Sequence, residues 1–104
     1  MAAEGVPLCR LLRVNEDGSR DVELTRPQSE PLGIFFSKGR ETKKDGLVVK
    51  SFLDKHAKKL FAGILRVGDE IVEIDESDIC PLTLDEVKDI IQQKERMVIK
   101  LCPL

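Results

Sequence analysis

The sequence predicts an α+β fold in a single domain, with strands, a short helix, further strands, a longer helix and a last strand in that order. Three observations carry this prediction. Short runs of β-branched and aromatic residues are separated by turn segments, a capping signature begins a helix at residue 83, and residues 96–102 alternate charged and apolar side chains. With 104 residues, the chain can bury one ordinary hydrophobic core and little more.

Charge and cysteine content exclude several classes of protein. The 17 basic and 19 acidic residues leave a net charge of −2, whereas nucleic-acid binders usually carry a basic excess. The three cysteines lie far apart without a C-x-x-C pair, so neither a disulfide framework nor a zinc site is indicated. No apolar run approaches the ~18 residues of a membrane span, and the first residues lack the order of a signal peptide. We therefore expect a soluble, cytoplasmic protein without a metal or other cofactor.

Charges are also sorted along the chain. Residues 38–66 hold nine Lys or Arg against three acids, and residues 69–95 hold ten acids against two lysines. The basic stretch at 38–59 has two interpretations: a solvated loop and helix face, or a surface for acidic lipid headgroups. His56 is the only histidine, and its lysine-rich surroundings indicate an exposed position rather than a catalytic or metal site.

The N-terminal part predicts a hairpin. Residues 8–14 are apolar with interspersed arginines, and Asp17-Gly18 separates them from a second run at 20–26. Asp-Gly between two such runs is typical of a tight β-turn. Residues 27–31 form a loop by composition, since prolines frame polar residues there.

Segment 31–36 predicts an anion site at the start of a strand. If Gly33 closes a tight turn before a strand at 34–37, the backbone amides of Leu32, Gly33 and Ile34 converge on one carboxylate. This pattern is typical of a binding module.

A loop, a strand and a short helix follow. Residues 39–45 are polar and charged and predict a surface loop, and residues 47–52 predict a second strong strand. Asp54 can cap a helix that runs through Ala62, with Gly63 closing its C-terminal side. This helix is expected to pack against the core.

The last third predicts two strands around a second helix. Ile71, Val72 and Ile74 mark one strand, residues 78–81 are short and extended, and residues 96–102 close the sheet.

The second helix begins at a capping box. The Thr83 hydroxyl faces the amide of Glu86, and the Glu86 carboxylate reaches back. The helix is expected over residues 84–93, with Val87 and Ile91 on the stripe that faces the core.

Three signatures in this order resemble a PDZ domain. Pro-Leu-Gly-Ile at 31–34 stands in the place of the family's Gly-Leu-Gly-Phe loop, Gly-Ile-Leu-Arg-Val-Gly-Asp at 63–69 precedes a strand, and Thr-Leu-Asp-Glu-Val at 83–87 opens the second helix. The resemblance covers residues 20–102. Pro31 replaces the first glycine of the loop, but the amides needed belong to the next three residues, so the loop stays competent.

The resemblance implies a PDZ-like, partly open antiparallel barrel or sandwich of five to six strands, capped by two helices. Residues 20–104 then form the PDZ domain, and residues 1–19 form an N-terminal extension whose strand at 8–14 pairs with the first strand of the family core. The segments 31–33 and 83–87 are also similar to Par-6-type polarity scaffolds.

The resemblance further implies a protein–protein interaction module that binds the C-terminal tails of partners such as membrane receptors or signalling proteins. The tail adds as an antiparallel strand between strand 34–37 and helix 84–93, and the amides of Leu32, Gly33 and Ile34 hold its carboxylate. A short peptide buries little area, so affinity on the order of micromolar is expected. Such partners would place the chain at the inner face of the plasma membrane or at cell junctions.

Side chains of this groove set the ligand preference. Leu32, Ile34, Phe36 and Ile91 are expected to enclose the last ligand side chain, which should be apolar. Many PDZ domains carry a histidine at the first helical position, which binds a Ser or Thr two residues before the ligand's end. Leu84 occupies that helical position here and cannot make this hydrogen bond. We therefore expect an apolar ligand residue two before the ligand's end.

Four further residues complete the predicted groove. Phe35 points to the other face of its strand, where it is either part of the core or a lip for intermediate ligand side chains, and Ser37 ends the same strand. Lys50 and Lys88 are either solvated lysines or contacts for acidic ligand side chains. Lys88 can also shift the preference toward an acidic ligand residue two positions before the ligand's C-terminus.

Other functions stay open. The domain can instead bind an internal motif, self-associate through residues 8–14, bind acidic lipid headgroups through residues 38–59, or act as a substrate-sensing domain of a protease; a monomer without nucleic-acid binding is expected. No P-loop, H-E-x-x-H or G-x-G-x-x-G motif appears, and no nucleophile, base and orienting group assemble. An enzyme is therefore not expected.

Overall fold

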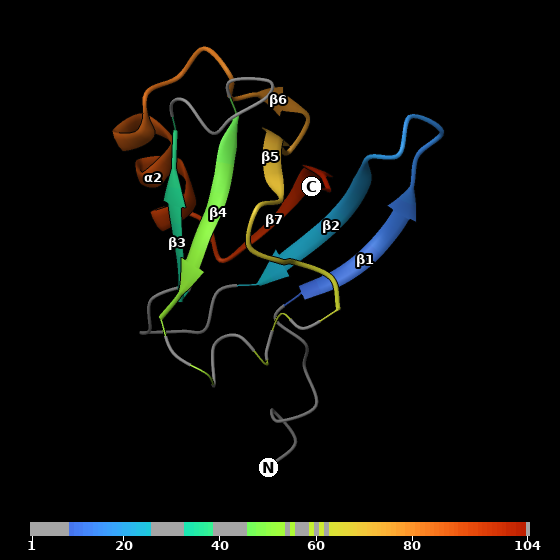
Figure 1. Ribbon diagram of the computed structural model, residues 1–104. Coiled ribbons are helices and arrows are strands. Elements are labelled where there is room, and N and C mark those ends of the chain that lie inside the picture. Colours follow the sequence, from blue (N-terminus) through green and yellow to red (C-terminus); the bar gives the residue numbers. More distant parts are fainter. Residues whose placement is uncertain are drawn as a thin grey trace.

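The computed structural model describes residues 9–25, 33–38, 46–53, 55, 59, 61 and 63–103 (Figure 1). In chain order its elements are β1 (Cys9–Val14), β2 (Arg20–Thr25), β3 (Ile34–Ser37), β4 (Leu47–Phe52), β5 (Glu70–Ile74), β6 (Ser77–Asp78), α2 (Leu84–Gln92) and β7 (Arg96–Cys102). The loops predicted at 27–31 and 39–45, and most of the helix predicted at 54–62, lie outside the described residues.

The strands form one antiparallel sheet in the order β1-β2-β7-β5-β4-β3, with β6 paired to β5 (Figure 1). This confirms the α+β class. The described residues contain seven strands rather than the predicted five to six, because β1 and β6 both join the sheet. β1 and β3 are the two ends of the strand order, and α2 lies beside β3 on the side opposite β4 (Figure 1).

The predicted N-terminal hairpin is present. β1 pairs antiparallel with β2, and the turn between them is closed by the Asn15 N–H donating to the Ser19 carbonyl at 2.8 Å and the Gly18 N–H donating to the Asn15 carbonyl at 3.0 Å. Gly18 has a φ of +89°, which glycine adopts at no steric cost. The extension therefore adds an edge strand to the sheet, while the domain boundary at residue 20 stays a prediction.

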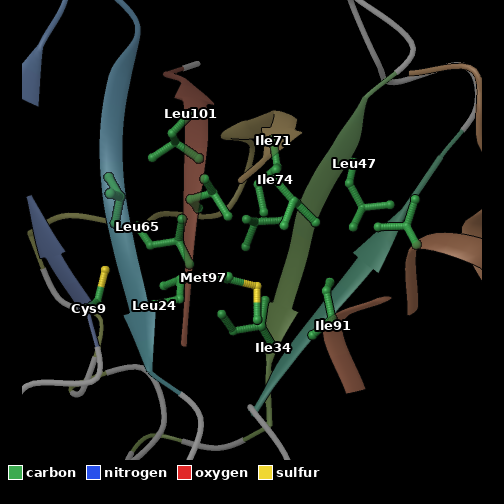
Figure 2. Packing of buried hydrophobic residues seen from close by; sticks show 14 of the residues in the cluster. Cys9, Leu24, Ile34, Leu47, Leu65, Ile71, Ile74, Ile91, Met97 and Leu101 are labelled. Atoms are coloured by element: carbon green, nitrogen blue, oxygen red, sulfur yellow. The ribbon is translucent and has the colours of Figure 1, made fainter. Parts of the chain in front are cut away.

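The core follows from alternation along the strands. On β7, Met97, Ile99 and Leu101 are buried and alternate with more exposed neighbours, as expected for a strand with one face on the core. Figure 2 shows Met97 and Leu101 in one cluster with side chains of the neighbouring strands, Leu65 of the 63–69 segment and Ile91 of α2. The buried hydrophobic cluster consists of Cys9, Val22, Leu24, Ile34, Leu47, Val49, Phe61, Leu65, Ile71, Ile74, Ile79, Val87, Ile91, Met97, Ile99 and Leu101.

Residues 63–69 fasten the start of β5 to β4. The Gly68 N–H donates to the Val49 carbonyl, and the Val49 N–H donates to the Asp69 carbonyl, both at 2.9 Å. The buried Asp69 carboxylate accepts the Arg66 N–H at 2.9 Å, which closes the turn. This part of the family signature is therefore a structural turn.

The capping box at the start of α2 is present as predicted. The Thr83 hydroxyl accepts the Glu86 N–H at 3.2 Å, and the Glu86 carboxylate accepts the Thr83 N–H at 2.9 Å. The second of these bonds lowers the pKa of Glu86 from its ordinary value. Val87 and Ile91 are the buried residues of the helix, as the stripe predicted, and Gln93 is its C-cap.

Asp75 holds the turn between β5 and β6. Asp75 and Glu76 have positive φ values of 51° and 68°. The Asp75 carboxylate accepts the Lys94 ammonium at 2.7 Å and the Val98 N–H at 2.9 Å. These two bonds, the one from Lys94 first, hold the pKa of Asp75 below its ordinary value.

We expect the free energy of unfolding to fall below about pH 4, and Asp75→Asn to reduce that fall. The folded-state pKa of this carboxyl lies below its unfolded value. Its stabilising contribution is therefore present above the unfolded pKa and is lost as the pH falls through the folded pKa. Urea unfolding at neutral and acidic pH measures the effect, with the exposed Asp89→Asn as matched control. An unchanged pH dependence in Asp75→Asn would show that other carboxyls cause it.

Candidate functional site

The free edge of β3 is the first half of the candidate site. In the part of the chain that the structure describes, β3 is the last strand of the sheet order, and it pairs on one side only, with β4. An edge strand presents unpaired N–H and C=O groups and is therefore a template for another strand.

The backbone of β3 presents alternate residues to this edge. The Leu53 N–H donates to the Gly33 carbonyl at 2.9 Å, which makes Ile34 opposite Phe52 a pair without mutual hydrogen bonds. The N–H and C=O groups of Ile34, and by alternation those of Phe36, consequently point away from β4. Lys50 is an extra residue opposite β3, but this bulge lies in β4 and leaves the alternation along β3 intact.

The turn at Gly33 has the conformation that the anion-site prediction requires. Gly33 has a φ of +87° and directly precedes β3. This region is rarely adopted by residues that carry a Cβ, and it lets consecutive amides converge. Leu32 lies outside the described residues, so the carboxylate site is described at Gly33 and Ile34 only.

The side chains of β3 separate into two faces. Ile34 belongs to the core cluster, and Phe36 is half-buried against it. Phe35 points the other way and is 52% exposed, so it is not part of the core. The other predicted role of Phe35, a contact for intermediate ligand side chains at the edge of the groove, stays a prediction. Ser37, the last residue of β3, is half-buried.

α2 provides the second half of the candidate site. Ile91 is buried, Leu84 is half-buried and Lys88 is exposed, at spacings that place all three on one side of the helix. Ile91 and Ile34 both point into the core cluster, where α2 meets β3 (Figure 2). They retain 7% and 9% exposure, more than most of the cluster, as expected at the open margin of a core.

Lys38 contributes a contact that the sequence did not reveal. Its ammonium donates to the carbonyls of Cys80 at 3.0 Å and Leu82 at 2.5 Å, and thereby joins the end of β3 to the segment before α2. The sequence pattern grouped Lys38 with the basic stretch 38–59. Sequence separations of 42 and 44 residues give no local signal for such a bond.

A concave feature lies on another part of the sheet, away from β3 and α2. A hollow of about 350 Å³ is lined by residues of β1, β2, β5, β7 and two adjoining turns, most of them charged or polar, together with Val98 and Ile99. Its charges pair across strands, Arg13 with Asp21 at 3.3 Å and Lys100 with Glu73 at 3.8 Å. This arrangement is that of a solvated, charge-paired sheet face.

Two kinds of feature are absent from the described residues. No three His, Cys, Asp or Glu residues among them are grouped as a metal site requires. No helix among them is long and apolar enough to cross a membrane.

Comparison with known proteins points to one family. The family model of the PDZ domain matches residues 21–102, which is most of the chain. No curated protein matches the chain in sequence. Similarity to solved structures is extensive in fold and low in sequence.

Three solved structures illustrate this similarity. The second PDZ domain of Dlg1 from the choanoflagellate Monosiga brevicollis has a TM-score of 0.67 at 18% identity, covering 84% of this chain and all of that one. The fifth PDZ domain of InaD has a TM-score of 0.66 at 13% identity, covering 83% and 96%. The dmPar3 PDZ1 domain, in complex with the dmPar6 PBM, has a TM-score of 0.63 at 20% identity, covering 81% and 93%. At these identities the likeness shows the fold; the finer resemblance to Par-6-type scaffolds stays a prediction.

Proposed function

We propose, because the chain belongs to the PDZ domain family, that it binds the C-terminal tails of partner proteins by adding each tail as a strand to β3, between β3 and α2. PDZ domains are non-enzymatic protein–protein interaction modules, so the family match confirms the prediction that the chain is not an enzyme. The partner peptide in the dmPar3 complex supports peptide binding as the mode of interaction.

One observation carries this proposal. The free edge of β3 begins at Gly33, whose φ of +87° turns the chain at the point where the carboxylate would lie, and continues with outward-pointing backbone groups at Ile34 and Phe36. A tail that pairs with this edge ends at the turn. The amides of Leu32, Gly33 and Ile34 then hold its carboxylate by charge-assisted hydrogen bonds.

The ligand preference follows from the side chains on both walls. Ile34, Phe36 and Ile91, with Leu32, form an apolar site for the last ligand residue. Leu84 at the first turn of α2 is apolar and half-buried, so it favours an apolar residue two before the end. Phe35 is exposed on the outer face, where it can contact the ligand's next-to-last side chain, because strand side chains alternate.

Two lysines supply a weaker contribution. Lys88 is exposed one turn after Leu84, and Lys50 is exposed on the outer face of β4. Each can attract an acidic ligand side chain upstream of the end, and at an exposed site such a contact contributes about 0.5 kcal/mol.

The experiment that tests carboxylate capture compares one octapeptide ending in Val-Ala-Val as the free acid and as the amide. Titration into the full chain should give a dissociation constant for the acid on the order of micromolar and a loss of about tenfold or more for the amide. Equal affinities would show that the carboxylate is not recognised.

Leu84→His is expected to move the ligand preference toward Ser or Thr two before the end. The imidazole supplies a hydrogen-bond partner for the hydroxyl, which is worth about 1 kcal/mol, or roughly a fivefold change in relative affinity. A C-terminal peptide library screened on the unmodified chain and on Leu84→His measures the shift, with Asp89→Ala at an exposed position elsewhere on α2 as the control. A strict Ser or Thr preference in the unmodified chain would contradict the role given to Leu84.

A second candidate function is favoured by the other edge of the sheet. Leu11, Leu12 and Val14 on β1 are 41%, 44% and 60% exposed, and β1 is the opposite end of the described strand order. Self-association through β1 is the alternative that this surface supports. Sedimentation as a function of concentration tests it, since a monomer at all concentrations would exclude it.

A further inference from the structure

Lys38 follows the last residue of β3 and reaches the segment that leads into α2. Its ammonium donates to the carbonyls of Leu82 at 2.5 Å and Cys80 at 3.0 Å, and lies 3.5 Å from that of Ile79. A lysine ammonium has three donors and no acceptor, so these three carbonyls match its hydrogen-bonding capacity. Lys38 thereby connects two segments that are 41 to 44 residues apart in the sequence.

The segment 79–82 is fixed to the sheet at one end and enters the helix at the other. Ile79 is 1% exposed, and its N–H donates to the Val72 carbonyl at 3.2 Å. The Leu82 N–H donates to the Ile79 carbonyl at 3.0 Å, and Thr83 then caps α2. The bond from Lys38 to Leu82 consequently acts one residue before the helix cap.

The charge of Lys38 also reaches both ends of this segment. The Cys80 N–H lowers the pKa of Asp78, and the Thr83 N–H lowers that of Glu86; in both cases the positive charge of Lys38 adds a smaller effect in the same direction. The hydrogen bonds to residues 79, 80 and 82 place the ammonium between β6 and the first turn of α2.

We propose that Lys38 is a positioning residue, which holds the first turn of α2 at a fixed place relative to the end of β3 and so sets the selectivity for the ligand residue two before the end. This inference rests on the proposed function. A tail antiparallel to β3 has its upstream residues near Ser37 and near Leu84. The ammonium of Lys38 already donates its hydrogen bonds to backbone carbonyls, so Lys38 acts through the position of Leu84 and not by contact with the ligand.

Two substitutions in the full chain test this role. Lys38→Met keeps most of the side-chain length and removes the donors, and Lys59→Met at an exposed position matches the change in charge. Each variant is titrated with octapeptides ending in Val-Ala-Val and Ser-Ala-Val. The dissociation constant for the Ser-Ala-Val peptide divided by that for the Val-Ala-Val peptide should fall about fivefold in Lys38→Met and stay unchanged in Lys59→Met. The ratio of the dissociation constants of the amide and free-acid peptides should stay within about twofold of its value in the unmodified chain in both variants.

A measurement without ligand accompanies the titrations. Amide hydrogen exchange should become faster at Glu86 and Val87 in Lys38→Met, where α2 begins, and stay unchanged in the central pair β2–β7. This outcome would show a local shift of the helix start in a folded domain.

Several outcomes overturn the inference. If Lys38→Met weakens both peptides equally, leaves their ratio unchanged, or loses exchange protection throughout β2 and β7, Lys38 supports folding only, and the inference fails while the proposed function stands. If the unmodified chain binds acid and amide peptides alike, the proposed function fails and the inference fails with it.

Discussion

Gly33→Ala is expected to lower the affinity for a C-terminal peptide about tenfold or more and to lower the free energy of unfolding by about 1–2 kcal/mol. Gly33 has a φ of +87°, where a Cβ is strained. Relief of that strain turns the peptide units around residue 33, and the amides of Gly33 and Ile34 then no longer converge on one carboxylate. Calorimetric titration with the free-acid peptide and urea unfolding measure the two effects.

Gly63→Ala is the matched control for this substitution. Gly63 has a φ of +82°, and a Cβ added there meets nothing within 4 Å. Its loss of stability should therefore be similar to that of Gly33→Ala, while peptide affinity should stay unchanged because Gly63 belongs to neither wall of the groove. Equal affinity of both variants for the peptide would contradict a carboxylate site at Gly33.

Phe61→Ala is expected to lower the free energy of unfolding by about 3–5 kcal/mol. Phe61 is fully buried, and its ring stacks on Phe52 with centroids 5.9 Å apart and an interplanar angle of 22°. Removal of the ring leaves a cavity between β4 and the rest of the core. Chemical denaturation monitored by circular dichroism gives the value, and the milder Phe61→Leu gives a measurable loss if the alanine variant does not fold.

Phe35→Ala removes an exposed aromatic ring, in contrast to Phe61→Ala, which removes a buried one. Phe35 is 52% exposed, so its removal should change the free energy of unfolding by no more than about 0.5 kcal/mol. Affinity for peptides with an aromatic next-to-last residue should fall, because Phe35 shares the face on which that side chain lies. A large loss of stability in Phe35→Ala would contradict its position on the outer face.

Elements determined by local sequence were predictable. The Asp17-Gly18 turn and the Thr83–Glu86 capping box each depend on residues within a few positions of one another, and both are present. The buried stripe of α2 at Val87 and Ile91 follows from helical periodicity in the same way.

The segment at 78–81 shows where local patterns were insufficient. It was expected to be extended, whereas only Ser77–Asp78 form a strand. The Asp78 carboxylate accepts the Cys80 N–H at 2.9 Å, and the Leu82 N–H donates to the Ile79 carbonyl, which together turn the chain. The chain turns here through one side-chain bond and one backbone bond, neither of which the residue pattern specified.

Contacts between distant segments were not predictable. Ion pairs join residues that are far apart in the sequence, since Lys94 pairs with Asp75 and Lys100 on β7 pairs with Glu73 on β5. The bonds of Lys38 to segment 79–82 depend on the completed fold in the same way. Sequence patterns specify residue types at the groove, whereas the relative placement of its two walls is a property of the tertiary structure.

Mapping the bound peptide on the protein tests the central claim most directly. Titration of isotope-labelled protein with a free-acid peptide ending in Val-Ala-Val, followed by amide chemical shifts, locates the binding surface. Strand addition at β3 predicts the largest changes at Gly33, Ile34 and Phe36 and along α2 from Leu84 to Ile91. Changes confined to β1, with β3 and α2 unaffected, would contradict it.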